Sequence, residues 1–265
     1  MDLQLSGKRV LVTGASKGIG LAIVRAFLDE GASVTAVSRR STPELDKTEA
    51  TLVAADLSEP DGPRRMIETA LAADPRLDVL VNNVGGGELP EGSLGDIFDG
   101  GDDTWQYVIN LNLGATVRVT RAALPALAEA RGAIVTVGSD SARRLGGPGD
   151  TPLPYAVAKA ALNRFSRGLA ERVAAQGIRV NTVSPSGTRT HAIAGDGGYM
   201  SQVAQAIGAD HATLMRNLPT DLGMLTDKLI EPEEIARAVL LLASPTMPSA
   251  IGANWAVDAG SIKVA

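Results

Sequence analysis

A tyrosine and a lysine one helical turn apart are the residues of this chain best suited to acid–base chemistry. They belong to the run Tyr155-Ala-Val-Ala-Lys159, and on a helix this spacing places both side chains on one face. A fixed cation favours the phenolate, so we expect Lys159 to lower the pKa of the Tyr155 phenol. The pair would then donate or accept a proton near neutral pH. Because such pairs often arise by chance, this one is informative only together with a second site.

A glycine-rich turn near the N-terminus is that second site. A strand-like run at 9–13 leads into Gly14-Ala-Ser-Lys-Gly18-Ile-Gly20 and then into a helical pattern. Gly14 would permit the tight turn, Gly18 the close approach of the backbone to a diphosphate, and Gly20 the packing of the helix on the strand. The free N–H groups of a helix that starts at Ile19 would face the negative charge. A hydride-carrying dinucleotide beside a proton-carrying phenol indicates a carbonyl/alcohol oxidoreductase.

Composition narrows the class of protein further. The 265 residues suit one large α/β domain, and with 45% hydrophobic but only 3% aromatic residues its core must be built from Ala, Val, Leu and Ile. A net charge of −5 argues against nucleic acid or an anionic membrane as the main partner. No apolar run could span a bilayer and no signal-peptide pattern is present, so a cytoplasmic location is expected.

The scarcity of cysteine and histidine excludes other chemistries. Cysteine is absent, which rules out disulfides and thiol catalysis, and the two histidines, His191 and His211, form no metal-binding motif. A serine hydrolase would need one of these histidines as its base, but neither lies near a strand-to-helix elbow around a serine. We therefore expect neither a metal site nor a hydrolase.

Short apolar runs alternate with longer helical patterns along the chain. The strand-like runs are 9–13, 33–38, 51–55, 79–82, 133–138, 179–183 and 254–257. The helical patterns lie near 19–30, 61–73, 104–130, 155–175 and 232–243. Strands that are apolar throughout and separated by helices predict a parallel sheet covered on both faces. The expected fold is α/β: a single-domain, doubly wound, Rossmann-type sheet of seven strands over 1–265, with its ligand at the carboxyl ends of the strands.

Two stretches interrupt this alternation. Residues 85–103 are rich in glycine and acidic side chains and are expected to form a long loop after the fourth strand. The segment 191–229 combines glycines with Met200, Met215 and Met224, and flexible thioethers suit a loosely specified apolar surface. We interpret 191–229 as a mobile lid over the substrate, with a plain surface excursion as the alternative.

The end of the second strand predicts which dinucleotide binds. An acidic residue there would accept hydrogen bonds from the ribose 2′-hydroxyl of NAD, but the run Ala36-Val-Ser38-Arg39-Arg40 has a serine instead. Arg39, with Lys17 from the glycine-rich turn, would supply charge-assisted donors to a 2′-phosphate. Arg40 is expected to be solvated. We therefore expect NADP(H), with a purely solvated arginine pair as the alternative interpretation.

Further motifs stand between the two sites in a fixed order. They are Thr13-Gly-x-x-x-Gly18-x-Gly20, Asn82-Asn83-Val84-Gly85, Ser139, Tyr155 and Lys159. Together they resemble the short-chain dehydrogenase/reductase family, in its short single-domain branch, and in particular its 3-oxoacyl-ACP reductase-like and carbonyl reductase-like members. The resemblance runs from about Leu5 to Gly260.

The resemblance implies a role for each matching position. Tyr155 would be the proton donor in reduction, Lys159 would also bind the nicotinamide ribose, and Ser139 would bond the substrate oxygen. Asn112 would anchor a water that links the lysine to solvent. The positions implied to bind the cofactor are Gly14, Ser16, Lys17, Gly18, Ile19, Gly20, Ser38, Arg39, Asp56, Leu57, Asn83, Gly85, Tyr155, Lys159, Pro185 and Thr190.

Several of these assignments have competitors. Ser141 is a second hydroxyl close to Ser139, and Asn110 competes with Asn112. Asp56 matches an adenine contact, although it or Ser58 could instead cap a helix beginning near Pro60.

Two other positions depart from, or stand beside, the family pattern. Ser186 replaces a glycine that the family normally has after Pro185, which puts the nicotinamide contact there in doubt. Trp255, in the last strand, is expected to pack in the core rather than to contact substrate.

The expected function is NADPH-dependent carbonyl reduction, reversible as secondary-alcohol dehydrogenation. The substrate is a small molecule whose identity the sequence leaves unassigned. One alternative is an NAD-linked alcohol dehydrogenase. Another, of a different class, is a catalytically silent NADP-binding sensor or scaffold, which would be expected to have lost Tyr155 or Lys159. The resemblance also implies a homotetramer, with the helices near 104–130 and 155–175 packing between subunits.

Overall fold

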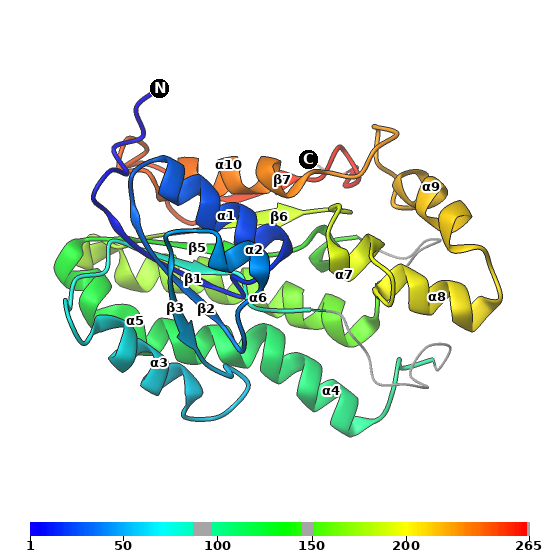
Figure 1. Cartoon of the computed structure of the whole chain (residues 1–265), viewed down its shortest axis with the longest axis horizontal. Helices are drawn as coiled ribbons and strands as arrows, with labels where there is room; N and C mark the ends of the chain where they lie inside the picture. The colour runs from blue at the N-terminus through cyan, green and yellow to red at the C-terminus, as the bar shows by residue number, and fades with distance from the viewer. Residues whose placement is uncertain (87–96, 145–150, 264–265) are drawn as a thin grey trace.

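Seven parallel strands form one sheet in the computed structural model, which describes residues 1–86, 97–144 and 151–263 (Figure 1). The strands are β1 (Arg9–Thr13), β2 (Ser33–Ser38), β3 (Thr51–Ala54), β4 (Val79–Asn82), β5 (Ala133–Val137), β6 (Arg179–Pro185) and β7 (Asn254–Val257). Their order across the sheet is β3-β2-β1-β4-β5-β6-β7, which confirms the predicted doubly wound, Rossmann-type fold. Every residue of β5 is buried, as expected for a parallel strand covered on both faces.

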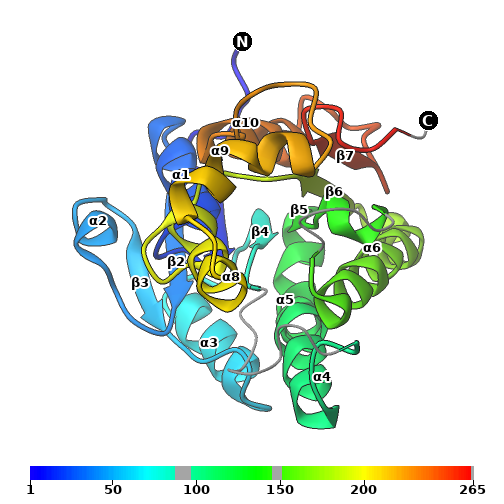
Figure 2. The same ribbon diagram turned by 90° about the vertical axis from the view of Figure 1, so that its right-hand side faces the viewer.

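Helices cover both faces of the sheet. They are α1 (Gly18–Asp29), α2 (Pro43–Asp46), α3 (Gly62–Leu71), α4 (Asp102–Ile109), α5 (Ala115–Ala130), α6 (Leu153–Val173), α7 (His191–Ala194), α8 (Tyr199–Ile207), α9 (His211–Asp221) and α10 (Pro232–Ala243). Figure 2 shows α1 and α10 on one side of the sheet and α3, α5 and α6 on the other. A π-helical turn (Asn110–Gly114) joins α4 to α5 without a break, so the helical pattern predicted near 104–130 is found, with this turn inside it.

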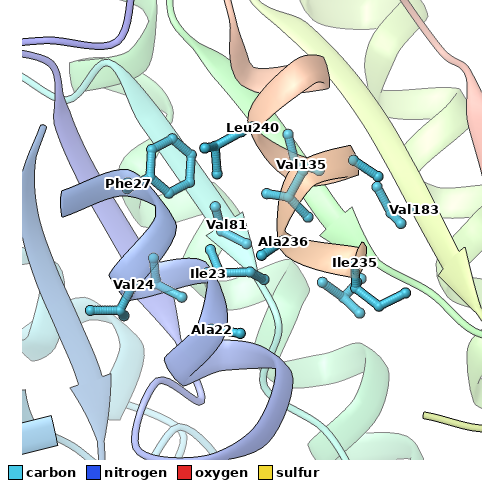
Figure 3. Close-up of a cluster of buried hydrophobic side chains, with 14 of the residues drawn as sticks. Ala22, Ile23, Val24, Phe27, Val81, Val135, Val183, Ile235, Ala236 and Leu240 are labelled. Atoms are coloured by element: carbon cyan, nitrogen blue, oxygen red, sulfur yellow. The ribbon is translucent and has the colours of Figure 1, made fainter. Parts of the chain in front are cut away.

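One core lies between the sheet and the α1–α10 pair. Figure 3 shows Ile23 and Phe27 of α1 and Leu240 of α10 packed over Val81 and Val135 of the central strands. All five side chains are buried, and burying a side chain of this size contributes about 1.5–3 kcal/mol. Aliphatic residues therefore build most of this core, as the composition predicts.

The sheet reverses its winding between β1 and β4. β1 pairs with both β2 and β4, and the chain leaves these two central strands toward opposite faces, through α1 and through α4 and α5. Loops that diverge in this way open a crevice at the carboxyl ends of the strands, where doubly wound proteins bind their ligands. The glycine-rich turn after β1 and the segment after Asn82 both lie at this crevice.

The segment 191–229 contains three short helices. It forms α7, α8 and α9 at the end of the molecule beyond the carboxyl end of β6 (Figure 1). Met200 and Met224 are only 6% and 7% exposed and belong to the core cluster, together with Leu218 and Leu222. The prediction that these two methionines form a loosely specified surface is therefore wrong, because Met200 on α8 and Met224 just after α9 both pack into the core cluster that includes α1 and α10.

Candidate active site

Tyr155 and Lys159 lie on one face of α6, as their spacing predicts. The Lys159 ammonium is 5.5 Å from the centre of the Tyr155 ring. It is buried and donates a hydrogen bond to the Val137 carbonyl, 3.0 Å away at the end of β5. The Tyr155 side chain hydrogen-bonds with Ser139, the residue that follows β5 after Gly138. The helix and the strand end thus bring a phenol, a hydroxyl and an ammonium together.

The pKa of the Tyr155 phenol differs from the expectation. Burial raises it to about 12, the hydrogen bond with Ser139 lowers it, and the Asp140 carboxylate raises it. Burial also lowers the pKa of Lys159 to about 8. The prediction that Lys159 lowers the pKa of Tyr155 is therefore wrong for the protein without ligand. Desolvation of the phenolate dominates, and the Lys159 ammonium is directed at the Val137 carbonyl.

Of the two candidate serines, Ser139 and Ser141, it is Ser139 that lies against the Tyr155 phenol. Ser139 precedes a short 3-10 turn (Asp140–Ala142), and its hydroxyl accepts hydrogen bonds from the Ser141 backbone N–H at 3.2 Å and from the Ser141 hydroxyl at 2.8 Å. Ser139 is the serine bonded to Tyr155, and Ser141 is a buried side chain that supports it. The structure thus brings Ser139, rather than Ser141, to the Tyr155 phenol.

The side chains of Asn112 and Asn110 bind different segments of the chain. Asn112, fully buried in the π-helical turn, accepts a hydrogen bond from the Gly86 N–H and donates to the carbonyls of Gly86 and Val108. A Cβ placed on Gly85 would lie 2.6 Å from Asn112 Oδ1 and 3.4 Å from Lys159 Nζ. Asn112 therefore holds the backbone after β4 against the lysine, which a side chain at position 85 would prevent.

Asn110 faces the other way. Its side-chain amide donates to the Ser58 carbonyl at 2.9 Å, and its oxygen accepts a hydrogen bond from Arg118 at 2.8 Å. Arg118 also donates to the Leu57 carbonyl. Asn110 and Arg118 thus fix the turn that follows β3, away from Lys159, and sequence reasoning did not single out Arg118.

The glycine-rich turn has the shape that a diphosphate requires. Gly14 and Gly18 adopt φ angles of +65° and +56°, which favour glycine, and a Cβ on Gly20 would lie only 2.1 Å from the Gly14 carbonyl oxygen. Lys17 precedes α1, and no side chain in the described part of the chain caps the first N–H groups of that helix. These donors are therefore available to an anion. Thr190 also lies here, its side-chain carbons within 3.3 Å of a Cβ placed on Gly18.

The end of β2 carries the groups expected to choose the cofactor. Arg39 is exposed, as is Lys17, and the Ser38 hydroxyl donates to the Arg40 carbonyl at 2.7 Å. The pKa of Asp56 is lowered by hydrogen bonds from the Ser58 hydroxyl and N–H and, less strongly, by the positive charge of Arg39. Arg39 and Asp56 are thus close enough to interact at the proposed adenosine end of the crevice.

Two alternative roles of the residues after β3 are excluded. The helix α3 begins at Gly62 with Asp61 at its N-cap position, so neither Asp56 nor Ser58 caps it. The Asp56 carboxylate instead accepts both hydrogen bonds from Ser58 at 2.9 and 2.6 Å. Leu57 is buried beside them, in a second core cluster that includes residues of α3 and α5.

The remaining predicted positions take different places in the crevice. The Asn83 side chain donates to the carbonyls of Thr13 and Gly14, so it ties β4 to the glycine-rich turn. Pro185 ends β6 and is buried.

The Ser186 hydroxyl is buried and has no hydrogen-bond partner among the described residues. Trp255 packs partly buried against the core, as predicted.

The described residues contain neither a candidate membrane span nor a candidate metal cluster. No helix there is long and apolar enough to cross a membrane. In the same part of the chain, no three histidine or acidic side chains gather closely enough to hold a metal ion.

A family model described as enoyl-(acyl carrier protein) reductase matches residues 14–261, nearly the whole chain. The chain belongs to the short-chain dehydrogenase/reductase family. It is 35% identical to an uncharacterised oxidoreductase of Bacillus subtilis, YvrD, over 99% of both chains. It is 31% identical to the 3-oxoacyl-[acyl-carrier-protein] reductase FabG of Chlamydia pneumoniae, over 98% of this chain and 99% of the relative.

Solved structures agree with this membership. The L-sorbose reductase of Gluconobacter frateurii, solved with NADPH and L-sorbose, is 29% identical to this chain and matches it over the full length of both with a TM-score of 0.87. As a member of the short-chain dehydrogenase/reductase family, the chain is an oxidoreductase that needs a nicotinamide cofactor and acts on a small molecule. The glycine-rich turn, with its uncapped helix N-terminus, fits such a cofactor.

The lid assignment remains a prediction that hydrogen exchange can test. We expect amides in α7, α8 and α9 to exchange faster than those of α10 in the protein without ligand, and to slow when cofactor and substrate bind. The reason is that Gly195, Gly197 and Gly198 separate α7 from α8 and can act as hinges, and moving segments come from the least stable parts of a fold. Strong protection throughout 191–229 without ligand would rule out a lid.

Proposed function

We propose that this protein is an NADPH-dependent carbonyl reductase that also runs in reverse as a secondary-alcohol dehydrogenase. The observation that carries the proposal is the hydrogen bond between Tyr155 and Ser139 with Lys159 buried beneath them, at the same edge of the sheet as the glycine-rich turn. A phenol and a hydroxyl that converge from a helix and a strand end can hold one substrate oxygen between them.

The residues of the chain would share the work as follows. The nicotinamide, when bound, supplies the hydride for the carbonyl carbon. Tyr155 would give its proton to the carbonyl oxygen, and Ser139 would hold that oxygen while negative charge develops on it. Lys159 would place a positive charge near the phenol as it loses its proton, and Asn112 would keep the backbone beside the lysine in place.

Preference for NADPH is supported by charge at the end of β2. Ser38 occupies the position at which an acidic residue would repel a 2′-phosphate. The side chains of Arg39 and Lys17 are exposed and would be available to bind that phosphate. The L-sorbose reductase that resembles this chain was solved with NADPH. An NAD-linked alcohol dehydrogenase is the alternative within the family. A silent NADP-binding scaffold is disfavoured because Tyr155, Lys159 and Ser139 are all present and Tyr155 hydrogen-bonds with Ser139.

A panel of ketones, including sugars, acyl thioesters and simple ketones, tests this proposal. Consumption of NADPH and of NADH is followed by absorbance with each compound. We expect turnover of at least one compound, faster with NADPH. Absence of turnover with every carbonyl and every corresponding alcohol, while NADPH still binds, would favour the silent scaffold.

We also propose that the protein assembles with copies of itself through α5 and α6. Between these helices lies an open apolar groove lined by Leu113, Val117, Ala161, Phe165, Gly168 and Leu169, flanked by Arg164 and Arg172. The exposed Tyr107, Leu153 and Val157 lie on α4 and at the start of α6, the helices adjoining this groove. Apolar side chains that continue along neighbouring helices suit a second copy of the same surface.

A bulky residue in this groove should break the assembly. Because a Cβ on Gly168 would meet only the flexible ends of Arg172 at 3.1 Å and Arg164 at 3.6 Å, Gly168→Trp is expected to fold but to fill the groove. Light scattering should show wild type as a tetramer and the variant as a smaller species. Arg25→Trp, at an exposed position on α1, is the control that should keep the wild-type mass. A wild-type monomer, or an unchanged mass of Gly168→Trp, would contradict the assignment.

A further inference from the structure

A buried carboxylate stands next to the proposed reactive hydroxyl. Asp140 directly follows Ser139 and is only 6% exposed. Its Oδ2 accepts a hydrogen bond from the Ser261 hydroxyl, 2.9 Å away in the segment after β7, and its Oδ1 lies 3.4 Å from the Ser139 hydroxyl. Carboxylates are seldom buried to this degree without partners that compensate for the lost water.

This carboxylate competes for the Ser139 hydrogen. A serine hydroxyl has one hydrogen to donate, and Ser139 already accepts hydrogen bonds from the N–H and hydroxyl of Ser141. If the Ser139 hydrogen is directed at Asp140, it cannot stabilise a phenolate at Tyr155. Because Ser141 takes both lone pairs of the Ser139 oxygen, Tyr155 and Asp140 compete for the single Ser139 hydrogen. The negative charge of Asp140 acts in the same direction, because it disfavours a second anion close by.

The charge of Asp140 is not tightly paired. The Arg144 Nε lies 3.9 Å from Asp140 Oδ2, beyond hydrogen-bond distance, while another nitrogen of this guanidinium donates to the Thr151 hydroxyl at 2.9 Å. Further described titratable or charged groups lie on α6 itself, on the elements packed against it, and at Asp99, which accepts a hydrogen bond from the Leu153 N–H. They are Asp99, Asp102, Asp103, Tyr107, Arg143, Lys159, Arg164, Arg167, Glu171, Arg172 and Arg179. Of these groups and Asp140, it is the charge of Asp140 that acts on the pKa of Tyr155.

We propose that Asp140 is a positioning residue that draws the Ser139 hydrogen toward itself and so keeps Tyr155 in the form that donates a proton. This inference rests on the proposed function, because it matters only where Tyr155 is the proton donor. Its consequence is a bias toward carbonyl reduction. A phenol that stays protonated to higher pH supports reduction to higher pH, whereas alcohol oxidation, which needs the phenolate, begins only at higher pH.

Direct titration of Tyr155 tests the proposal without turnover. Phenolate absorbance is recorded by stopped flow immediately after jumps to alkaline pH, before the protein can unfold. The chain has 3 tyrosines, so each protein is compared with the same protein carrying Tyr155→Phe, and the difference belongs to Tyr155. Wild type is compared with Asp140→Asn, which removes the charge, with Asp140→Glu, which keeps it, and with Ser261→Ala, which removes only the hydrogen bond to Asp140.

We expect Asp140→Asn to lower the midpoint of the Tyr155 titration by about half a pH unit or more, a threefold or larger change in its ionisation constant. Asp140→Glu and Ser261→Ala should stay near wild type. An unchanged midpoint in Asp140→Asn overturns the proposal. So does an equal shift in Ser261→Ala, because loosening of the C-terminal segment would then explain both results.

The pH dependence of turnover separates this inference from the proposed function. With any compound that the ketone panel finds, kcat/KM for reduction should fall at lower pH in Asp140→Asn than in wild type, and oxidation should begin to rise at lower pH. Unshifted profiles beside normal wild-type turnover would contradict the role of Asp140 alone. A shifted titration in a protein that reduces no carbonyl would contradict the proposed function and leave the electrostatic effect of Asp140 in place.

Discussion

Tyr155→Phe is expected to abolish turnover while leaving cofactor affinity unchanged. The substitution removes only the phenolic hydroxyl, and with it the proton that the substrate oxygen must receive. General acid catalysis contributes about 10²- to 10⁴-fold to the rate, so kcat should fall at least a hundredfold. The Kd of NADPH, measured by calorimetry, should stay at the wild-type value because the Lys159 ammonium and the glycine-rich turn remain.

A second tyrosine provides the control for this substitution. Tyr107 lies on α4 and is 45% exposed, so Tyr107→Phe should keep wild-type kcat. If Tyr155→Phe retains about a tenth or more of the wild-type kcat, the loss is too small for a removed general acid, and Tyr155 is not the proton donor.

Arg39→Ala is expected to reduce the preference for NADPH over NADH by about ten- to a hundredfold. A 2′-phosphate brings up to two negative charges to the end of β2, and hydrogen bonds to charged groups contribute about 1.5–3 kcal/mol each. Lys17→Ala should have a smaller effect in the same direction. Ser38→Asp should also favour NADH, because a carboxylate repels the phosphate and accepts hydrogen bonds from the ribose hydroxyls.

The measurement is the ratio of Kd values for NADPH and NADH in each protein. Arg40→Ala is the matched control, since Arg40 is exposed beside Arg39 and is expected to be solvated. A wild type that binds both cofactors equally, or an unchanged ratio in Arg39→Ala, would contradict the cofactor assignment. The assignment of Tyr155 would survive that result.

The fold could be predicted from the sequence because its central strands are buried on both faces. Val79–Asn82 and Ala133–Val137 are mostly apolar and buried throughout, and such runs separated by helices have few solutions besides a doubly wound sheet. The position of the glycine-rich turn after β1 and of Tyr155 and Lys159 on one helix followed from local spacing alone. These features depend only on residues close together in the sequence, so they could be predicted from it.

Features that depend on contacts between distant segments could not be predicted from the sequence. The Asp140–Ser261 hydrogen bond joins residues 121 positions apart, although the place of Asp140 directly after Ser139 was a signal that could have been used. The raised pKa of Tyr155 depends on how deeply α6 buries the phenol, which spacing does not reveal. The three helices in 191–229 were not predicted, because they are short and the glycines and polar residues among them interrupt the helical pattern of apolar residues.

Transfer of deuterium from the cofactor to the product tests the central claim most directly. NADPH that carries deuterium in place of both hydrogens on its hydride-bearing carbon is mixed with the protein and a ketone that supports turnover, and the alcohol is analysed by mass spectrometry and NMR. The account predicts one deuterium per alcohol molecule, bound to the former carbonyl carbon, and no labelled alcohol with Tyr155→Phe. An unlabelled alcohol, or label at any other carbon, would contradict hydride transfer to a carbonyl at this site.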